Sequence, residues 1–221
     1  SIPSGHTNDT FVYDITKAPY YNNAEKRDYA NLLNLTVEGM NAGVPTNYSP
    51  AFTNYVENIY VGYKFYETAA AEGIIDYDKT VQFPFGYGLS YTTFKQEMND
   101  LTVDGTQISV DVTVTNTGSV AGKDVVEVYF NPPYTNGGIE KASANLVRFA
   151  KTGMLEPGQS EVVTLNFDQE DMASFDEKGT GCYVLEQGDY VISINADSHT
   201  ILDQRTFTLA DTITYNESNP R

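Results

Sequence analysis

The stretch TQISVDVTVTNTG, residues 106–118, alternates between apolar and polar side chains. Ile108, Val110, Val112 and Val114 fall on one side of an extended chain, and the serine, aspartate and threonines between them fall on the other. A period of two is typical of an antiparallel strand that buries one face and exposes the other. We therefore expect a half-buried strand here.

Two later stretches, EVVTLNF and DYVISIN, repeat this alternation, while VVEVYF at residues 125–130 alternates less cleanly. The aligned apolar side chains are Val163, Leu165 and Phe167 in the first stretch and Tyr190, Ile192 and Ile194 in the second. Several short strands of this kind indicate a fold that is mainly β.

Turn residues separate these strands. Asp104-Gly105 suits a tight primed hairpin turn, and Pro157-Gly158 suits a type II turn. Further breaks fall at residues 116–118 and 187–189. Six or seven short strands over about 120 residues predict an antiparallel β-sandwich of the immunoglobulin or fibronectin type III kind. The sequence has one cysteine and no tryptophan, so it lacks the core of antibody domains, which favours the fibronectin-like variant.

Residues 1–83 read differently, as an extended and mostly irregular N-terminal arm rich in proline, glycine and asparagine. Within this arm NYVENIYVGYKFYETAAAEG, residues 54–73, fits a helix that Gly73 would end, but β-branched and aromatic residues over IYVGYKFYE also allow a strand. An arm of this kind rarely folds alone. We expect it to be the tail of another domain or a segment that lies over one.

Composition excludes several classes of function. The formal net charge is −17, from 13 basic and 30 acidic residues, which disfavours binding to nucleic acid or to anionic membranes. No apolar run is long enough to span a bilayer, and no signal peptide is recognisable at the start, so both a cytoplasmic and a secreted protein stay open.

The sequence contains no recognisable catalytic residue or metal site, and we expect no cofactor. The two histidines, His6 and His199, lie in turn-like sequence far from any partner, and we expect both to be solvated. Cys182 is expected to be a small buried residue. The acids of DQED, residues 168–171, lack the spacing of a calcium loop and are read as a solvated turn.

The segment PFGYGLSYTTF, residues 84–94, contains two glycines, four aromatic rings and no charge. It closely resembles the segment that joins the last two domains of glycoside hydrolase family 3 enzymes, the β-glucosidases and their relatives. Three further blocks, together with YVENIYVGYKFYE at residues 55–67, follow the family pattern in the same order over roughly residues 52–209: VDVTVTNTGSVAGKDVVEVYF, NLVRFAKTGMLEPGQSEVVTLNF and LEQGDYVISINADS. Asn58, Lys64 and Glu127 depart from the usual glycine, arginine and glutamine.

The resemblance implies a retaining, exo-acting β-glycosidase of β-glucosidase type that acts in carbohydrate metabolism. Its catalytic aspartate would lie in a (β/α)8-like barrel and its acid/base glutamate in an α/β sandwich domain. Neither catalytic motif is found in this sequence. The chain is therefore expected to be inactive alone, with the barrel and α/β sandwich portions as its partners and a β-glucoside as substrate of the full enzyme. A stand-alone carbohydrate-binding or adhesion module is the alternative, and the arm argues against it.

The resemblance also predicts the domain boundaries. Residues 1–83 would be the tail of the α/β sandwich domain, residues 84–94 the interdomain joint, residues 95–210 the fibronectin type III-like domain, and residues 211–221 a linker to a following segment. On this reading the barrel follows Arg221, an order that some family members show. Phe83 and the four rings of the joint, Phe85, Tyr87, Tyr91 and Phe94, would fill the seam between two domains.

Overall fold

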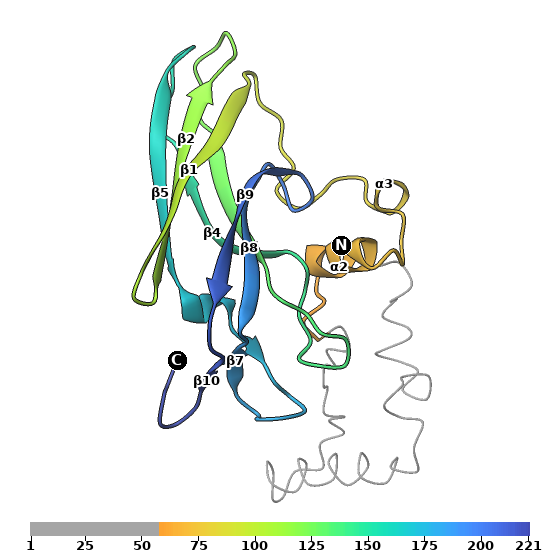
Figure 1. The fold of residues 1–221 in the computed structure, drawn as a ribbon. Coiled ribbons are helices and arrows are strands. Elements are labelled where there is room, and N and C mark those ends of the chain that lie inside the picture. The colour runs from red at the N-terminus through yellow and green to blue at the C-terminus, as the bar shows by residue number, and fades with distance from the viewer. Residues whose placement is uncertain (1–57) are drawn as a thin grey trace, which may run out of the picture. The chain divides into compact units, whose positions relative to one another are not determined.

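The structure, a computed structural model, describes residues 58–221, of which residues 59–221 form one compact unit. It is mainly β, and its long strands are all antiparallel, as predicted (Figure 1). Residues 1–57 of the predicted arm, with His6, lie outside the described part of the chain.

Seven strands form the two sheets of a sandwich, in agreement with the expected number. The first sheet has the order β1-β2-β5, with β1 at Phe94–Asp104, β2 at Gln107–Asn116 and β5 at Ser160–Asp168. The second has the order β4-β3-β8-β9, with β4 at Asn145–Lys151, β3 at Val125–Asn131, β8 at Gly188–Asn195 and β9 at Ile201–Leu209.

A small third sheet closes one end of the sandwich in the order β10-β7-β6. Its strands are β10 at Ile213–Tyr215, β7 at Tyr183–Leu185 and β6 at Ser174–Phe175. Ile213 and Tyr215 pack against the main core, so these residues of the predicted linker are part of the fold in this structure. Whether residues 211–221 also lead to a further segment stays a prediction.

The core confirms the alternation in the sequence. The apolar stripe of β2, from Ile108 to Val114, is fully buried, and it packs with the inward side chains of β5 and β8. Register places Ile108 opposite Phe167 and Val112 opposite Val163, so the apolar faces of β2 and β5 coincide. Burial of this continuous apolar surface is the main force that holds the sandwich together.

Both predicted turns are present. β1 and β2 are joined by the two-residue loop Gly105-Thr106, with Gly105 at φ 61°, a pattern typical of a type II′ turn; the glycine is as expected, but the loop lies one residue later than Asp104-Gly105. At Pro157-Gly158 the amide of Gln159 donates to the carbonyl of Glu156 and Gly158 has φ 79°, as a type II turn requires.

Before the sandwich the described chain forms two helices, α2 at Tyr63–Ala71 and α3 at Tyr77–Thr80. Within the ambiguous stretch, residues 63–71 are helical; Glu72 caps the helix, and Gly73 follows at φ 69°. Asn58, which stands where the family pattern has glycine, has φ 52°. Asparagine is among the few residues that tolerate this left-handed conformation, which explains the substitution.

Two smaller expectations need correction. Cys182 is only half-buried, because it lies in the loop between β6 and β7 rather than on an inward strand face. The acids at residues 168–171 are not merely a solvated turn: Gln169–Met172 is a 3₁₀-helix (η4) whose cap pairs Asp168 with Asp171, and Met172 is buried in the core. Among residues 58–221 no helix is long and apolar enough to cross a membrane.

Candidate functional site

The sheet β4-β3-β8-β9 is covered on both faces. Its inner face lines the core, and α2 lies beside its outer face (Figure 1). Tyr129, Ser193 and Asn195 point away from the core, yet all three are buried. Together with Ala70 and Ala71 of α2 they line a cavity of about 470 Å³ between the helix and the sheet. This helix–sheet interface is the candidate functional site, because it joins the end of the arm to the sandwich.

Three aromatic rings from three segments form the apolar part of the interface. The Tyr63 ring of α2 stacks on Phe85 of the joint, with centroids 4.8 Å apart, and meets the Tyr129 ring of β3 edge to face at 6.1 Å. The Tyr63 hydroxyl accepts a hydrogen bond of 2.9 Å from the amide of Leu146 in β4. Tyr63 thus packs by its ring and positions α2 against β4 by its hydroxyl.

Glu67, one turn further along α2, is the polar centre of the interface. Its side chain is 7% exposed, and its carboxylate accepts hydrogen bonds from the Tyr77 hydroxyl at 2.6 Å and the Ser198 hydroxyl at 2.7 Å. The second carboxylate oxygen lies 2.8 Å from Nδ1 of His199. A buried carboxylate is stable only when it is fully hydrogen-bonded, and here α3 and the β8–β9 loop supply the partners.

His199 is an exposed loop residue, as the sequence predicted, but it is not without partners. Although it remains accessible to water, its ring stacks on Tyr77 with centroids 3.6 Å apart and planes within 4°, in addition to its contact with Glu67. No local sequence pattern could reveal this cluster, because its members lie up to 132 positions apart.

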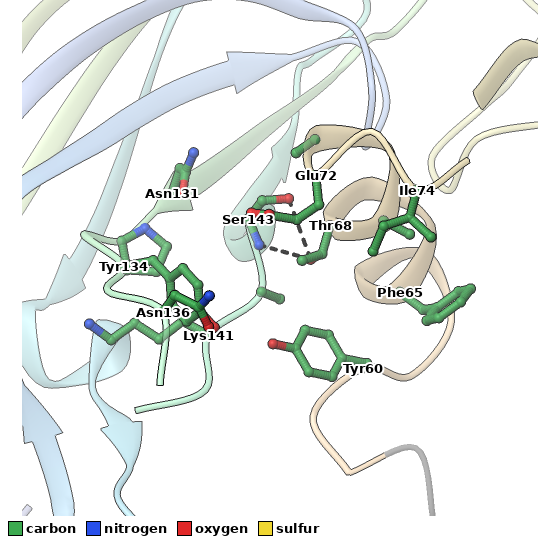
Figure 2. Close-up of a pocket in the computed structure, with 14 residues that line it drawn as sticks. Tyr60, Phe65, Thr68, Glu72, Ile74, Asn131, Tyr134, Asn136, Lys141 and Ser143 are labelled. Carbon is green, nitrogen blue, oxygen red and sulfur yellow. Dashed lines mark hydrogen bonds between the residues drawn. The ribbon is translucent and has the colours of Figure 1, made fainter. Parts of the chain in front are cut away.

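A second set of polar contacts connects the arm to the loop between β3 and β4. The Thr68 hydroxyl accepts a hydrogen bond of 3.0 Å from the amide of Ser143, and the Tyr60 hydroxyl donates to Glu140 at 2.8 Å. Figure 2 shows these two segments on opposite sides of a pocket of about 690 Å³. Lys141 at this pocket is buried, but its charge is paired with Glu186.

The joint makes a tight turn against β3. The amide of Tyr87 donates to the carbonyl of Pro84, and Gly86 has φ 88°. The positive φ of Gly86 favours glycine, and a β-carbon there would also lie 2.8 Å from a carboxylate oxygen of Glu127, which would have to shift. Gly88 meets neither condition. The carbonyl of Phe85 also accepts a hydrogen bond of 2.8 Å from the amide of Ser198.

Of the five rings that were expected to fill a seam, only two pack against other parts of residues 58–221. Phe85 packs on Tyr63 but stays 49% exposed, and Phe94 packs against the sandwich core. Phe83, Tyr87 and Tyr91 are exposed. The joint therefore has one side turned toward the sandwich and one side turned away from it.

Burial shifts the pKa of three groups at the interface, Glu127, Tyr63 and Tyr129. It raises the pKa of the Glu127 carboxyl, an effect that the hydrogen bond from the Tyr129 hydroxyl opposes and that the charges of Asp197 and Asp124 add to. Burial likewise raises the pKa of the Tyr63 and Tyr129 hydroxyls, which stay protonated and can donate or accept hydrogen bonds. Among the described residues no group of three or more histidine, cysteine or acidic side chains could hold a metal ion.

Replacement of Glu67 tests its role in the interface. We expect Glu67→Ala to lower the free energy of unfolding by about 2–3 kcal/mol, because buried donors lose their acceptor. The matched control is Glu72→Ala, at the exposed end of the same helix, which should change it by less than about 0.5 kcal/mol. Urea unfolding of both variants measures the difference, and equal effects would contradict a role for the buried carboxylate.

The two glycines of the joint should respond differently to the same change. Gly86→Ala forces a side chain into a left-handed conformation and against Glu127, so we expect a loss of about 1–3 kcal/mol. Gly88→Ala meets no atom closer than 4.0 Å and should be nearly neutral. Thermal unfolding of the two single variants is sufficient; a larger loss for Gly88→Ala would show that the described turn is wrong.

Glu127→Gln probes the buried carboxylate through pH. The folded state raises the pKa of Glu127, so the stability that this group contributes is lost as pH rises through that value. We expect Glu127→Gln to raise the Tm at neutral pH and to have less effect near about pH 4, where the carboxyl takes up a proton. Exposed Glu156→Gln is the control. A lower Tm at neutral pH would mean that the hydrogen bond from Tyr129 outweighs burial.

The sequence of this chain is similar to a known domain family and to known β-glucosidases. Residues 124–198 match the fibronectin type III-like domain family. The chain is 33% identical over 214 residues to a β-glucosidase of Ruminococcus albus, which covers 95% of this chain and 19% of the relative. It is 36% identical over 169 residues to a β-glucosidase of Kluyveromyces marxianus, covering 72% of this chain and 19% of the relative.

Solved structures of β-glucosidases are also similar to this chain. The structure of β-glucosidase 3B from Thermotoga neapolitana in complex with α-D-glucose matches with a TM-score of 0.64 at 36% identity, over 86% of this chain and 24% of that one. The GH3 β-glucosidase of Bifidobacterium adolescentis matches with a TM-score of 0.62 at 30% identity, over 76% of this chain and 23% of that one. The chain thus spans about a fifth to a quarter of the length of these relatives, and it belongs to glycoside hydrolase family 3 as a part that contains the fibronectin type III-like domain.

Proposed function

We propose that this chain is a non-catalytic portion of a retaining, exo-acting β-glucosidase, in which the sandwich supports the parts that carry the catalytic aspartate and glutamate. The relatives are β-glucosidases, and the chain spans only 19% of the first two of them. The barrel and α/β sandwich portions of the same enzyme would be its partners, and a β-glucoside the substrate of the whole.

The observation that carries this proposal is the interface around Glu67. A fibronectin-like sandwich has no need of a helix on the outer face of one sheet, and a carboxylate buried there costs free energy unless several donors surround it. We infer that the hydrogen bonds around Glu67 hold a neighbouring domain in one position on the sandwich. We therefore assign residues 59–83 to the end of the preceding domain, residues 84–94 to the joint, and the Glu67 cluster to the connection between that domain and the sandwich.

The support that the sandwich gives would act through position rather than chemistry. Catalysis by two carboxylates depends on their separation, which in retaining enzymes is about 5–5.5 Å. A domain that carries one of the two must therefore be held in a fixed orientation. A helix packed by rings and buried hydrogen bonds on a rigid sheet provides such an anchor.

Activity measurements test the proposal. The 221-residue chain should not hydrolyse an aryl β-glucoside, and the full-length protein that contains it should. In the full-length protein Glu67→Ala should lower the Tm and the activity together, with Glu72→Ala as the control. Turnover by the chain alone would contradict the assignment as non-catalytic, and an inactive full-length protein would contradict the assignment to a β-glucosidase.

A further inference from the structure

The cavity between α2 and the outer face of the sheet contains a buried polar side chain without a partner. Asn195 is 3% exposed, lines this cavity and lies opposite Glu127 of β3, on the face that points away from the core. Its side-chain oxygen accepts no hydrogen bond from residues 58–221. Nearly all buried polar atoms in native proteins have a partner, because an unpaired one is costly. Asn195 therefore indicates that the cavity takes up a molecule that can donate a hydrogen bond.

Two further polar side chains lie next to Asn195 on the same face. Ser193, two residues earlier on β8 and 5% exposed, pairs with Gln204 of β9, and both line the cavity. Within the described part of the chain neither the Ser193 hydroxyl nor the Gln204 side-chain amide makes a hydrogen bond. Strands β8 and β9 thus present one hydroxyl and two amides that can bind a ligand.

The wall that α2 contributes to the cavity is apolar. Ala70 and Ala71 of α2 and Ile75, which follows the helix, line this side. A molecule between the helix and the sheet therefore meets methyl groups on one side and hydrogen-bonding groups on the other. Ile201, which also lines the cavity, is 55% exposed, so the cavity opens to water and a ligand can enter.

The charged groups at the cavity are already paired. Of the described residues that line it, Glu67 and His199 are the ones that can carry a charge near neutral pH, and they contact each other. Glu67 also accepts hydrogen bonds from Tyr77 and Ser198. A charged ligand would lose its water here without gaining a free counter-charge, which is unfavourable. The site therefore suits a neutral molecule.

We propose that this cavity binds a neutral monosaccharide, and that the ligand is glucose. The hydroxyls of a sugar donate and accept hydrogen bonds, and a side-chain amide offers a donor and an acceptor side by side, so Asn195 and Gln204 suit pairs of adjacent hydroxyls. The C–H groups of the sugar ring would pack on Ala70 and Ala71. The cavity volume, about 470 Å³, lies within the range of about 300–1,000 Å³ that small-molecule sites occupy.

This inference rests on the proposed function, since a β-glucosidase releases glucose and thereby supplies the ligand. Water is the poorer occupant. A single ordered water molecule satisfies Asn195, but water in the rest of the cavity would lie against Ala70 and Ala71, where apolar surface gains from contact with carbon. Bound glucose would contact α2 and β8 at once and would strengthen the connection between the arm and the sandwich.

Thermal unfolding of the 221-residue chain in increasing glucose tests the proposal. The chain is used alone, so that the catalytic parts of the full enzyme contribute no glucose binding; its residues 59–221 form one compact unit with its own core. We expect a rise in Tm that saturates and reaches about 3–6 °C at ten times the dissociation constant. Sucrose at the same concentrations measures the rise without saturation that excluded sugars cause in any protein.

Substitutions place the effect at the cavity. Asn195→Leu should abolish the saturable rise without lowering the Tm in the absence of glucose, because it replaces an unpartnered polar group by an apolar one of similar shape. Ser193→Ala, a smaller change, should weaken glucose binding about three- to tenfold. The matched control is Asn166→Leu, at an exposed position of β5 in the other sheet, which should respond to glucose as the unsubstituted chain does.

Two results would overturn the proposal. One is a rise in Tm that follows sucrose and never saturates, which would leave only water in the cavity. The other is a saturable rise that both Asn195→Leu and Ser193→Ala retain, which would move the glucose to a different place. Neither result touches the proposed function, because hydrolysis of aryl β-glucosides by the full-length protein decides that separately.

Discussion

The buried carboxylate of Glu67 fixes how the end of the arm lies on the sandwich. At this carboxylate α2, α3 and the β8–β9 loop meet, through hydrogen bonds from Tyr77 and Ser198 and the contact with His199. Apolar packing of Tyr63 alone would hold the helix near the sheet without a unique orientation, because dispersion and hydrophobic forces have little direction. Hydrogen bonds to a buried charge are directional and costly to break, so they select one arrangement.

This arrangement changes what the outer face of the sheet must contain. A sandwich strand normally alternates apolar residues inside with solvated polar residues outside. In β3 and β8 the outward Tyr129, Ser193 and Asn195 are instead buried beneath α2. Tyr129 compensates by donating to Glu127, whereas one oxygen of Asn195 finds no protein partner beside the cavity. The second face is therefore a polar, less densely packed layer than the core, which is common where two domains meet.

Sequence reasoning succeeded where one physical rule acts locally. The buried faces of β2, β5 and β8 follow from alternation, and the turns at Gly105 and Gly158 follow from the conformations that glycine allows. It failed where distant segments meet. The residues around His199 do not indicate a partner for its side chain. Its partner Glu67 lies in an ordinary amphipathic helix far away in the sequence, and the contact exists only in the folded sandwich. The joint shows the same limit: its two glycines look equivalent in the sequence, and the structure alone shows that Gly86 has a positive φ and lies close to Glu127, whereas Gly88 does neither.

The distribution of charge connects these features. An acidic chain with a net charge of −17 repels itself, so its carboxylates are best placed in water and away from each other. Glu67 is buried but surrounded by donors, and Glu127 is half-buried beside a turn, where burial and neighbouring acids raise its pKa. The family pattern has glutamine at position 127, which would keep the acceptor for Tyr129 without a charge. Burying the Glu127 charge beside Gly86 is therefore a cost that glutamine would avoid. The Glu127 carboxylate lies on the inward side of the joint, and the joint itself contains no charged residue.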